Sequence, residues 1–73
     1  MNWDMVEGQW KHLKGKFREQ WGKLTDDDLE TIAGKKDQLV GKLQERYGMK
    51  KDEAEQQASQ YIDGMNRDVE TKH

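Results

Sequence analysis

Residues 21 to 49 read WGKLTDDDLETIAGKKDQLVGKLQERYGM. They contain one complete turn followed by one complete helix start, and at Gly48 they begin a second turn of the same kind. The Thr25 hydroxyl is placed to accept a hydrogen bond from the backbone N–H of Asp28, as an N-cap does. Asp26 to Asp28 fill the first turn, where the helix dipole favours carboxylates. Gly22 is expected to take the left-handed conformation that closes the preceding helix. One helix therefore ends, and the next begins, within four residues.

Length and composition predict one small domain. The chain has 73 residues, no cysteine, 38% charged and 32% hydrophobic residues, and a mean hydropathy of -1.34. This composition leans toward disorder, but the net charge of only -2 removes the self-repulsion that usually accompanies it. The absence of cysteine suits a reducing compartment. No basic and apolar leader and no run of about 18 apolar residues occurs, so a soluble cytoplasmic protein without a membrane span is expected.

Apolar residues follow helical spacing in three segments. The first stripe predicts one amphipathic helix from Trp3 to Trp21, capped by Asn2 or Asp4, with residues 1–8 as a start that frays. The second segment starts at Thr25, and periodicity alone allows it to run from Asp26 to Tyr47 as one helix. Gly34 favours a break at residues 34–36, and Gly48 favours an end after Tyr47. The third helix opens near residue 51 and reaches Met65, and residues 66–73 are expected to be loose.

An internal repeat of 26 residues underlies this organisation. The pattern LxGKΦxExΦGxxxD, where Φ is an apolar residue, occurs from Leu13 to Asp26 and again from Leu39 to Asp52. The repeat predicts an all-α domain of four or five short helices, arranged as two crossed hairpins over residues 9–33 and 34–65.

Two glycines in the helices of this repeat are unexpected. Gly15 and Gly41 occupy equivalent positions, and a glycine inside a helix costs about 1 kcal/mol against alanine. Their equivalence predicts that both mark close helix crossings, where an added methyl group would destabilise the fold.

Charge alternates along the chain. Residues 9–23, 25–33, 34–51 and 52–73 carry net charges of +4, -4, +4 and -4, so each predicted hairpin pairs a basic arm with an acidic one. Intramolecular complementarity is the favoured interpretation. The alternative is a nucleic-acid surface in which Lys23, Lys50 and Lys51, beside the two turns, contact phosphates.

No catalytic, cofactor or metal constellation is discernible. The aspartates 26–28 lack the alternating oxygen ligands and central glycine of a calcium loop, so helix capping explains them better. His12 and His73 are isolated and are expected to be ordinary surface residues. The sequence therefore predicts no enzyme, no cofactor and no small-molecule substrate.

The segment from Trp10 to Glu55 resembles the CsbD-like family of small bacterial stress-response proteins. The most specific parts are GKLTDDD at Gly22 to Asp28 and GKKDQLVGKLQERYG at Gly34 to Gly48. Tyr61 stands where the resemblance leads us to expect a tryptophan in several relatives. The resemblance implies a compact bundle of two crossed hairpins similar to SAM-like domains, and accumulation under general stress. It implies no catalytic residue.

Together, these observations predict a non-enzymatic, monomeric stress protein that acts through abundance and contacts with other macromolecules under starvation, osmotic or salt stress. The sequence does not identify these macromolecular partners. A nucleic-acid-associated helical-hairpin module using the basic arms is the alternative, with binding expected to be weak.

Overall fold

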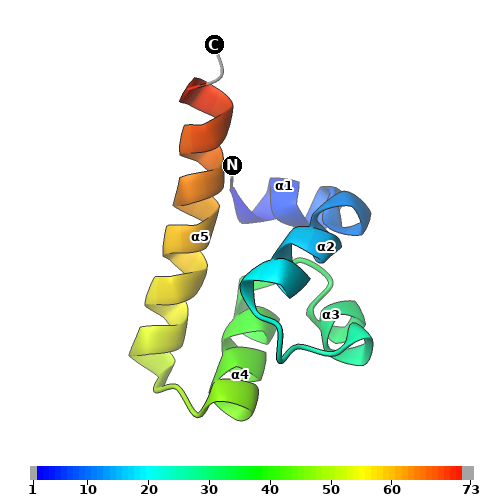
Figure 1. Ribbon diagram of the computed structural model, residues 1–73, viewed down its shortest axis with the longest axis vertical. Helices are drawn as coiled ribbons and strands as arrows, with labels where there is room; N and C mark the ends of the chain where they lie inside the picture. The colour runs from blue at the N-terminus through cyan, green and yellow to red at the C-terminus, as the bar shows by residue number, and fades with distance from the viewer. Residues whose placement is uncertain (1, 72–73) are drawn as a thin grey trace.

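The structure, a computed structural model, describes the backbone of residues 2–71 and the side chains of residues 2–65. Its described backbone forms five helices and no strand, which confirms the predicted all-α class: α1 (Trp3–Gly8), α2 (Trp10–Gln20), α3 (Asp26–Ile32), α4 (Lys36–Tyr47) and α5 (Lys51–Thr71). In Figure 1, α5 runs along one side of the molecule and the four shorter helices gather on the other. The 26-residue structural equivalence and the likeness to SAM-like domains stay predictions.

The first predicted helix is divided in two. The chain breaks at Gln9, whose φ of -110° and ψ of 20° separate α1 from α2. The Met5 N–H donates to the Asn2 side chain at 2.9 Å, so Asn2 is the N-cap. Val6 is fully buried. Residues 3–8 are thus a capped and anchored helix where a continuous stripe and a frayed start were predicted.

Gly22 does not close α2 in the way the sequence predicts. Glycine φ values in the left-handed region occur at Gly34 and Gly48, and not at Gly22. Instead, α2 ends when Trp21 leaves the helix with φ -125° and ψ 84°, which accompanies burial of its ring in the core. The Leu24 N–H then donates to the Trp21 carbonyl at 3.1 Å and closes the turn.

The segment from Asp26 to Tyr47 forms two helices, with the break where the sequence favours it. Ala33 and Gly34 both have positive φ, 48° and 80°, and they reverse the chain between α3 and α4. Gly48, with φ 67°, closes α4 and donates its N–H to the Gln44 carbonyl. At both glycines the left-handed backbone explains why no side chain is present.

The predicted crossings at Gly15 and Gly41 are wrong. Both glycines are exposed, and a Cβ built on either would meet nothing within 4 Å. The close approach lies at Gly34, where a Cβ would stand 2.6 Å from the Glu7 Cα and 3.0 Å from the Val6 carbonyl oxygen. Periodicity correctly places both glycines away from the core, but within the described residues no second helix packs against a Cβ at either position.

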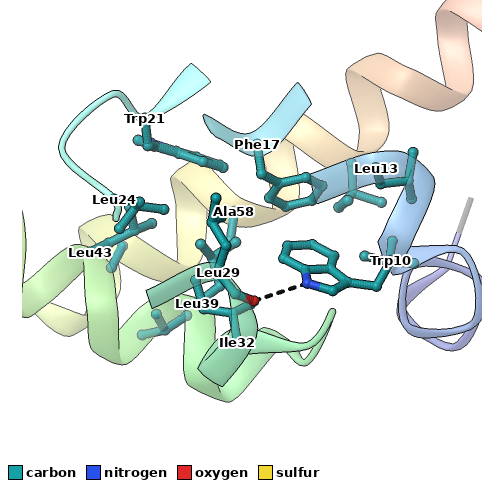
Figure 2. Close-up of a cluster of buried hydrophobic side chains, with 14 residues drawn as sticks. Trp10, Leu13, Phe17, Trp21, Leu24, Leu29, Ile32, Leu39, Leu43 and Ala58 are labelled. Atoms are coloured by element: carbon teal, nitrogen blue, oxygen red, sulfur yellow. Dashed lines mark hydrogen bonds between the residues drawn. The ribbon is translucent and has the colours of Figure 1, made fainter. Parts of the chain in front are cut away.

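The core is a single cluster to which every helix contributes. Phe17 lies among aromatic rings: its ring centroid is 4.9 Å from that of Trp10 and 5.1 Å from that of Tyr61, both in edge-to-face geometry. Tyr61 packs at the position where a tryptophan was expected in relatives. Figure 2 shows this cluster, whose buried apolar members are Val6, Trp10, Leu13, Phe17, Trp21, Leu24, Leu29, Ile32, Leu39, Val40, Leu43, Ala54, Ala58 and Ile62.

The last helix is longer than the sequence predicts. The α5 backbone continues to Thr71, six residues past Met65, so residues 66–71 are helical where a loose end was expected. Residues 72–73, the last part of that prediction, lie outside the described residues. Among the helices described, none combines the length and apolar character needed to cross a membrane.

Candidate functional site

Asp28 is the one buried charged side chain among residues 2–65, with 2% of its surface exposed. Arg46 from α4 holds both carboxylate oxygens: its Nε donates to Oδ2 at 2.8 Å and its Nη2 donates to Oδ1 at 3.0 Å. Lys42 Nζ lies 3.4 Å from Oδ1. The Thr25 backbone N–H donates to Oδ2 at 3.0 Å. Four donors from two elements therefore saturate the carboxylate.

This environment sets the protonation state of Asp28. The hydrogen bonds from Arg46, followed by that from the Thr25 backbone, hold the Asp28 pKa far below its ordinary value, although burial acts in the opposite direction. The group therefore stays ionised near neutral pH, and only 2% of its surface is exposed to solvent. It is suited to joining α3 to α4 rather than to acting as a general base.

The same residue completes the helix start that the sequence predicts. The Asp28 N–H donates to Thr25 Oγ1 at 3.1 Å while the Asp28 carboxylate accepts from the Thr25 N–H, which is a reciprocal capping box. The sequence predicts the cap but not the contacts of the Asp28 carboxylate with Arg46 and Lys42, which are called the Asp28 clamp below. The available signal was the spacing of Lys42 and Arg46, which stand four residues apart and so share one face of α4.

The remaining ion pairs show how the charged arms meet. The first basic arm pairs with the first acidic arm through Lys14 with Glu30 at 2.9 Å and Arg18 with Asp26 at 2.6 Å. The hydrogen bond between Lys14 and Glu30 lowers the pKa of Glu30 and raises that of Lys14.

The second basic arm does not follow the predicted pairing within its own hairpin. Its Lys42 and Arg46 turn to Asp28 on α3. Over the described side chains, no ion pair joins α4 to α5. The charge pairs thus link α2 to α3 and α3 to α4.

The three lysines of the nucleic-acid alternative stand at the connection between α2 and α3 and at that between α4 and α5. These two connections lie toward the same end of the molecule (Figure 1). The Lys23 N–H donates to the Tyr47 hydroxyl at 3.1 Å, and Lys23 Nζ lies 5.2 Å from the centroid of the Tyr47 ring. Lys50 and Lys51 follow in the turn into α5 and are exposed. Acidic side chains open α3 and α5 at the same end, so the local charge is mixed.

No group of three or more His, Cys, Asp or Glu side chains is placed to hold a metal ion in the described part of the chain. His12 is exposed on α2, and His73 lies outside the described residues. A hollow of about 660 Å³ lies where the α1–α2 junction faces α3, and its lining includes acidic Glu7 and Glu30 and basic Lys11 and Lys14.

Fold and surface together define a small helical domain with an apolar core and a densely charged surface, in which the buried carboxylate of Asp28 ties α3 to α4. The CsbD-like family model matches residues 4–56, and the chain belongs to that family. No solved structure matches it.

Curated relatives agree with this assignment. The UPF0337 protein YjbJ of Salmonella typhimurium is 65% identical over 57 residues, covering 78% of this chain and 81% of the relative. The UPF0337 protein ECA0631 of Pectobacterium atrosepticum is 59% identical over 63 residues, which cover 86% of this chain and 91% of the relative. The UPF0337 protein NE2439 of Nitrosomonas europaea is 52% identical over 61 residues, which cover 84% of this chain and 65% of the relative. None of these matches is to a catalytic family.

Proposed function

We propose that this protein is a non-enzymatic general stress-response protein that works as a cytoplasmic monomer, through abundance and weak contacts with other macromolecules under starvation, osmotic or salt stress. Membership of the CsbD-like family supports the stress role. The observation that carries the mode of action is the division between core and surface. Charged residues make up 38% of the chain, yet Asp28 is the single buried one among residues 2–65.

Such a surface suits a protein that must stay dispersed at high concentration. Charges of both signs alternate along it, and the net charge is small, so it can approach partners of either sign without strong binding. Met5, 47% exposed, is the one large hydrophobic side chain exposed among the side chains described. A surface of this kind offers little for self-association and can separate other macromolecules when water is scarce.

A drying assay tests this mode of action. A client enzyme is dried and rehydrated with the wild-type protein or with a variant in which Lys11, Lys35, Asp37 and Glu53, all exposed, are replaced by serine. The variant keeps the net charge and leaves the core and the Asp28 clamp intact, which circular dichroism verifies. We expect the recovered client activity to fall with the variant. Equal recovery at equal mass would show that surface charge is not the means of protection.

A second candidate function, a nucleic-acid-associated module, is supported by the contact between Lys23 and Tyr47 that brings both turns to one end. Mixed charge at that end limits it, so short duplex DNA is expected to bind no tighter than about 10⁻⁴ M at physiological salt. An NMR titration measures this. Saturable shifts at Lys23, Lys50 and Lys51 at micromolar DNA, lost when the three lysines are replaced by glutamine, would make this candidate the leading one.

A further inference from the structure

Two surface hollows adjoin along the seam between α2 and α5. The first, of about 350 Å³, is lined by Gln20, Gln57, Gln60 and Tyr61, and is called the amide hollow below. The second, also of about 350 Å³, shares Gln60 and Tyr61 and adds Gly64, Met65 and the charged residues Lys16 and Glu19. Among the described side chains, no carboxylate, ammonium or guanidinium lines the amide hollow, although 38% of the chain is charged. Its lining therefore offers neutral hydrogen-bonding groups where most of the surface offers charges.

Contacts with the core hold two of these four side chains in place. Trp21 Nε1 donates to Gln57 Oε1 at 3.3 Å, which orients that carboxamide. The Tyr61 hydroxyl donates to the Lys16 carbonyl at 2.9 Å. The Tyr61 ring meets Phe17 and Trp21 edge-to-face, each with centroids 5.1 Å apart. Burial, and then the negative charge of Glu19, raise the pKa of the Tyr61 hydroxyl above its ordinary value. The hollow thus has a fixed aromatic wall and one fixed amide before any ligand arrives.

The chemistry of this lining matches one ligand class. A carboxamide both donates and accepts hydrogen bonds, as does each hydroxyl of a sugar, so neighbouring hydroxyls can be met by one amide. The C–H face of a sugar ring is apolar and can pack on an aromatic wall. A charged ligand would find no counter-charge in the amide hollow. We infer that the amide hollow binds a neutral polyhydroxylated molecule, a mono- or disaccharide.

Size and exposure set the expected affinity. The volume lies at the lower end of small-molecule sites, which begin at about 300 Å³. Gln20 and Gln60 are exposed and must be ordered on binding. We therefore expect a Kd on the order of 1 mM. The adjoining hollow has the same volume, about 350 Å³, but Lys16 and Glu19 line it, so a second sugar ring there would lie beside charged groups.

An NMR titration of the full chain with trehalose tests the inference. Trehalose is added up to about 0.2 M, well above the expected Kd, and glycine betaine, a solute without hydroxyls, is added at equal osmolality in parallel. The side-chain amides of Gln20, Gln57 and Gln60 and the Trp21 indole N–H report on the hollow. We expect saturable shifts at these groups with trehalose and none with betaine. Linear shifts spread over the whole surface, or equal shifts with betaine, would overturn the proposal.

Variants separate a binding site from a solvent effect. The double variant Gln20→Ala, Gln60→Ala changes two exposed side chains, so the fold should survive, and circular dichroism checks this. It should weaken trehalose binding at least tenfold, while Gln38→Ala, an exposed glutamine outside both hollows, should leave it unchanged. Unchanged binding in the double variant would refute the site. Saturable binding of a neutral tetrapeptide without binding of trehalose would assign the hollow to peptide backbones and also refute it.

Discussion

Replacing Asp28 with asparagine removes the charge of the buried carboxylate and almost none of its volume. Asparagine can still accept the Thr25 N–H through its carbonyl oxygen, so the helix start keeps most of its cap. Its NH₂ group, however, must face one of the nitrogens of Arg46, both of which are donors and lie within 3.0 Å of the present carboxylate oxygens. The substitution therefore tests the clamp between α3 and α4 more than the cap.

The expected loss follows from the hydrogen bonds and the exposure of the partners. A hydrogen bond to a charged group contributes about 1.5 to 3 kcal/mol, and breaking a fully buried ion pair costs about 3 to 5 kcal/mol. The Arg46 side chain is 40% exposed and can regain water, whereas Asp28 cannot. We therefore expect Asp28→Asn to lower the free energy of unfolding by about 2 to 3 kcal/mol. In a domain of this size each kcal/mol shifts the Tm by about 4 to 8 °C.

The pH dependence of stability shows whether the loss in Asp28→Asn comes from the missing carboxylate charge. The Asp28 pKa is lower in the folded state than in the unfolded chain, so its contribution is fully present above the unfolded pKa of about 4 and is lost as pH falls below it. The wild type should lose stability on acidification more steeply than Asp28→Asn. The difference between the two proteins should accordingly shrink between about pH 7 and about pH 3.

Urea melts of both proteins at the two pH values measure these differences. Asp27→Asn is the matched control, because Asp27 is exposed on the same turn, and it should change stability by no more than about 0.5 kcal/mol. The reasoning is refuted if Asp28→Asn behaves like this control at neutral pH. It is also refuted if the difference from wild type stays undiminished in acid.

Three further predictions concern local backbone and capping. Gly15→Ala and Gly41→Ala should each raise the unfolding free energy by up to about 1 kcal/mol, because both positions face open space. A lower unfolding free energy in urea melts would contradict this and show that the added methyl group collides with another part of the chain. Gly34→Ala should lower the unfolding free energy by about 1 to 3 kcal/mol or more, since its Cβ would stand 2.6 Å from the Glu7 Cα at a φ of 80°; an unchanged denaturation midpoint would contradict this close approach. Thr25→Ala should cost about 1 kcal/mol through the lost cap, and added magnesium should leave the Tm of wild type unchanged; a magnesium-dependent rise would point to ligation by the aspartates.

Local chemistry in the sequence determined where most helices begin and end. Thr25 is followed three residues later by Asp28, and this spacing alone specifies a capped start, because both partners of the capping box lie within one turn. Gly34 and Gly48 mark chain reversals for an equally local reason, the positive φ that a side chain disfavours. Helical spacing likewise identified the apolar faces, and with them the all-α class.

Tertiary packing decided what lies against each face. Periodicity shows that Gly15 points away from the core, but it cannot show whether another helix covers it, and none does. The break at Gln9 arises where α1 turns to meet Gly34, a contact between residues 27 positions apart in the chain. The sequence places Asp28 in the first turn of a capped helix, and only the fold shows that α4 brings Arg46 within hydrogen-bond distance of its carboxylate. Short-range spacing sets backbone conformation, whereas burial and charge pairing depend on distances between helices that only the folded chain defines.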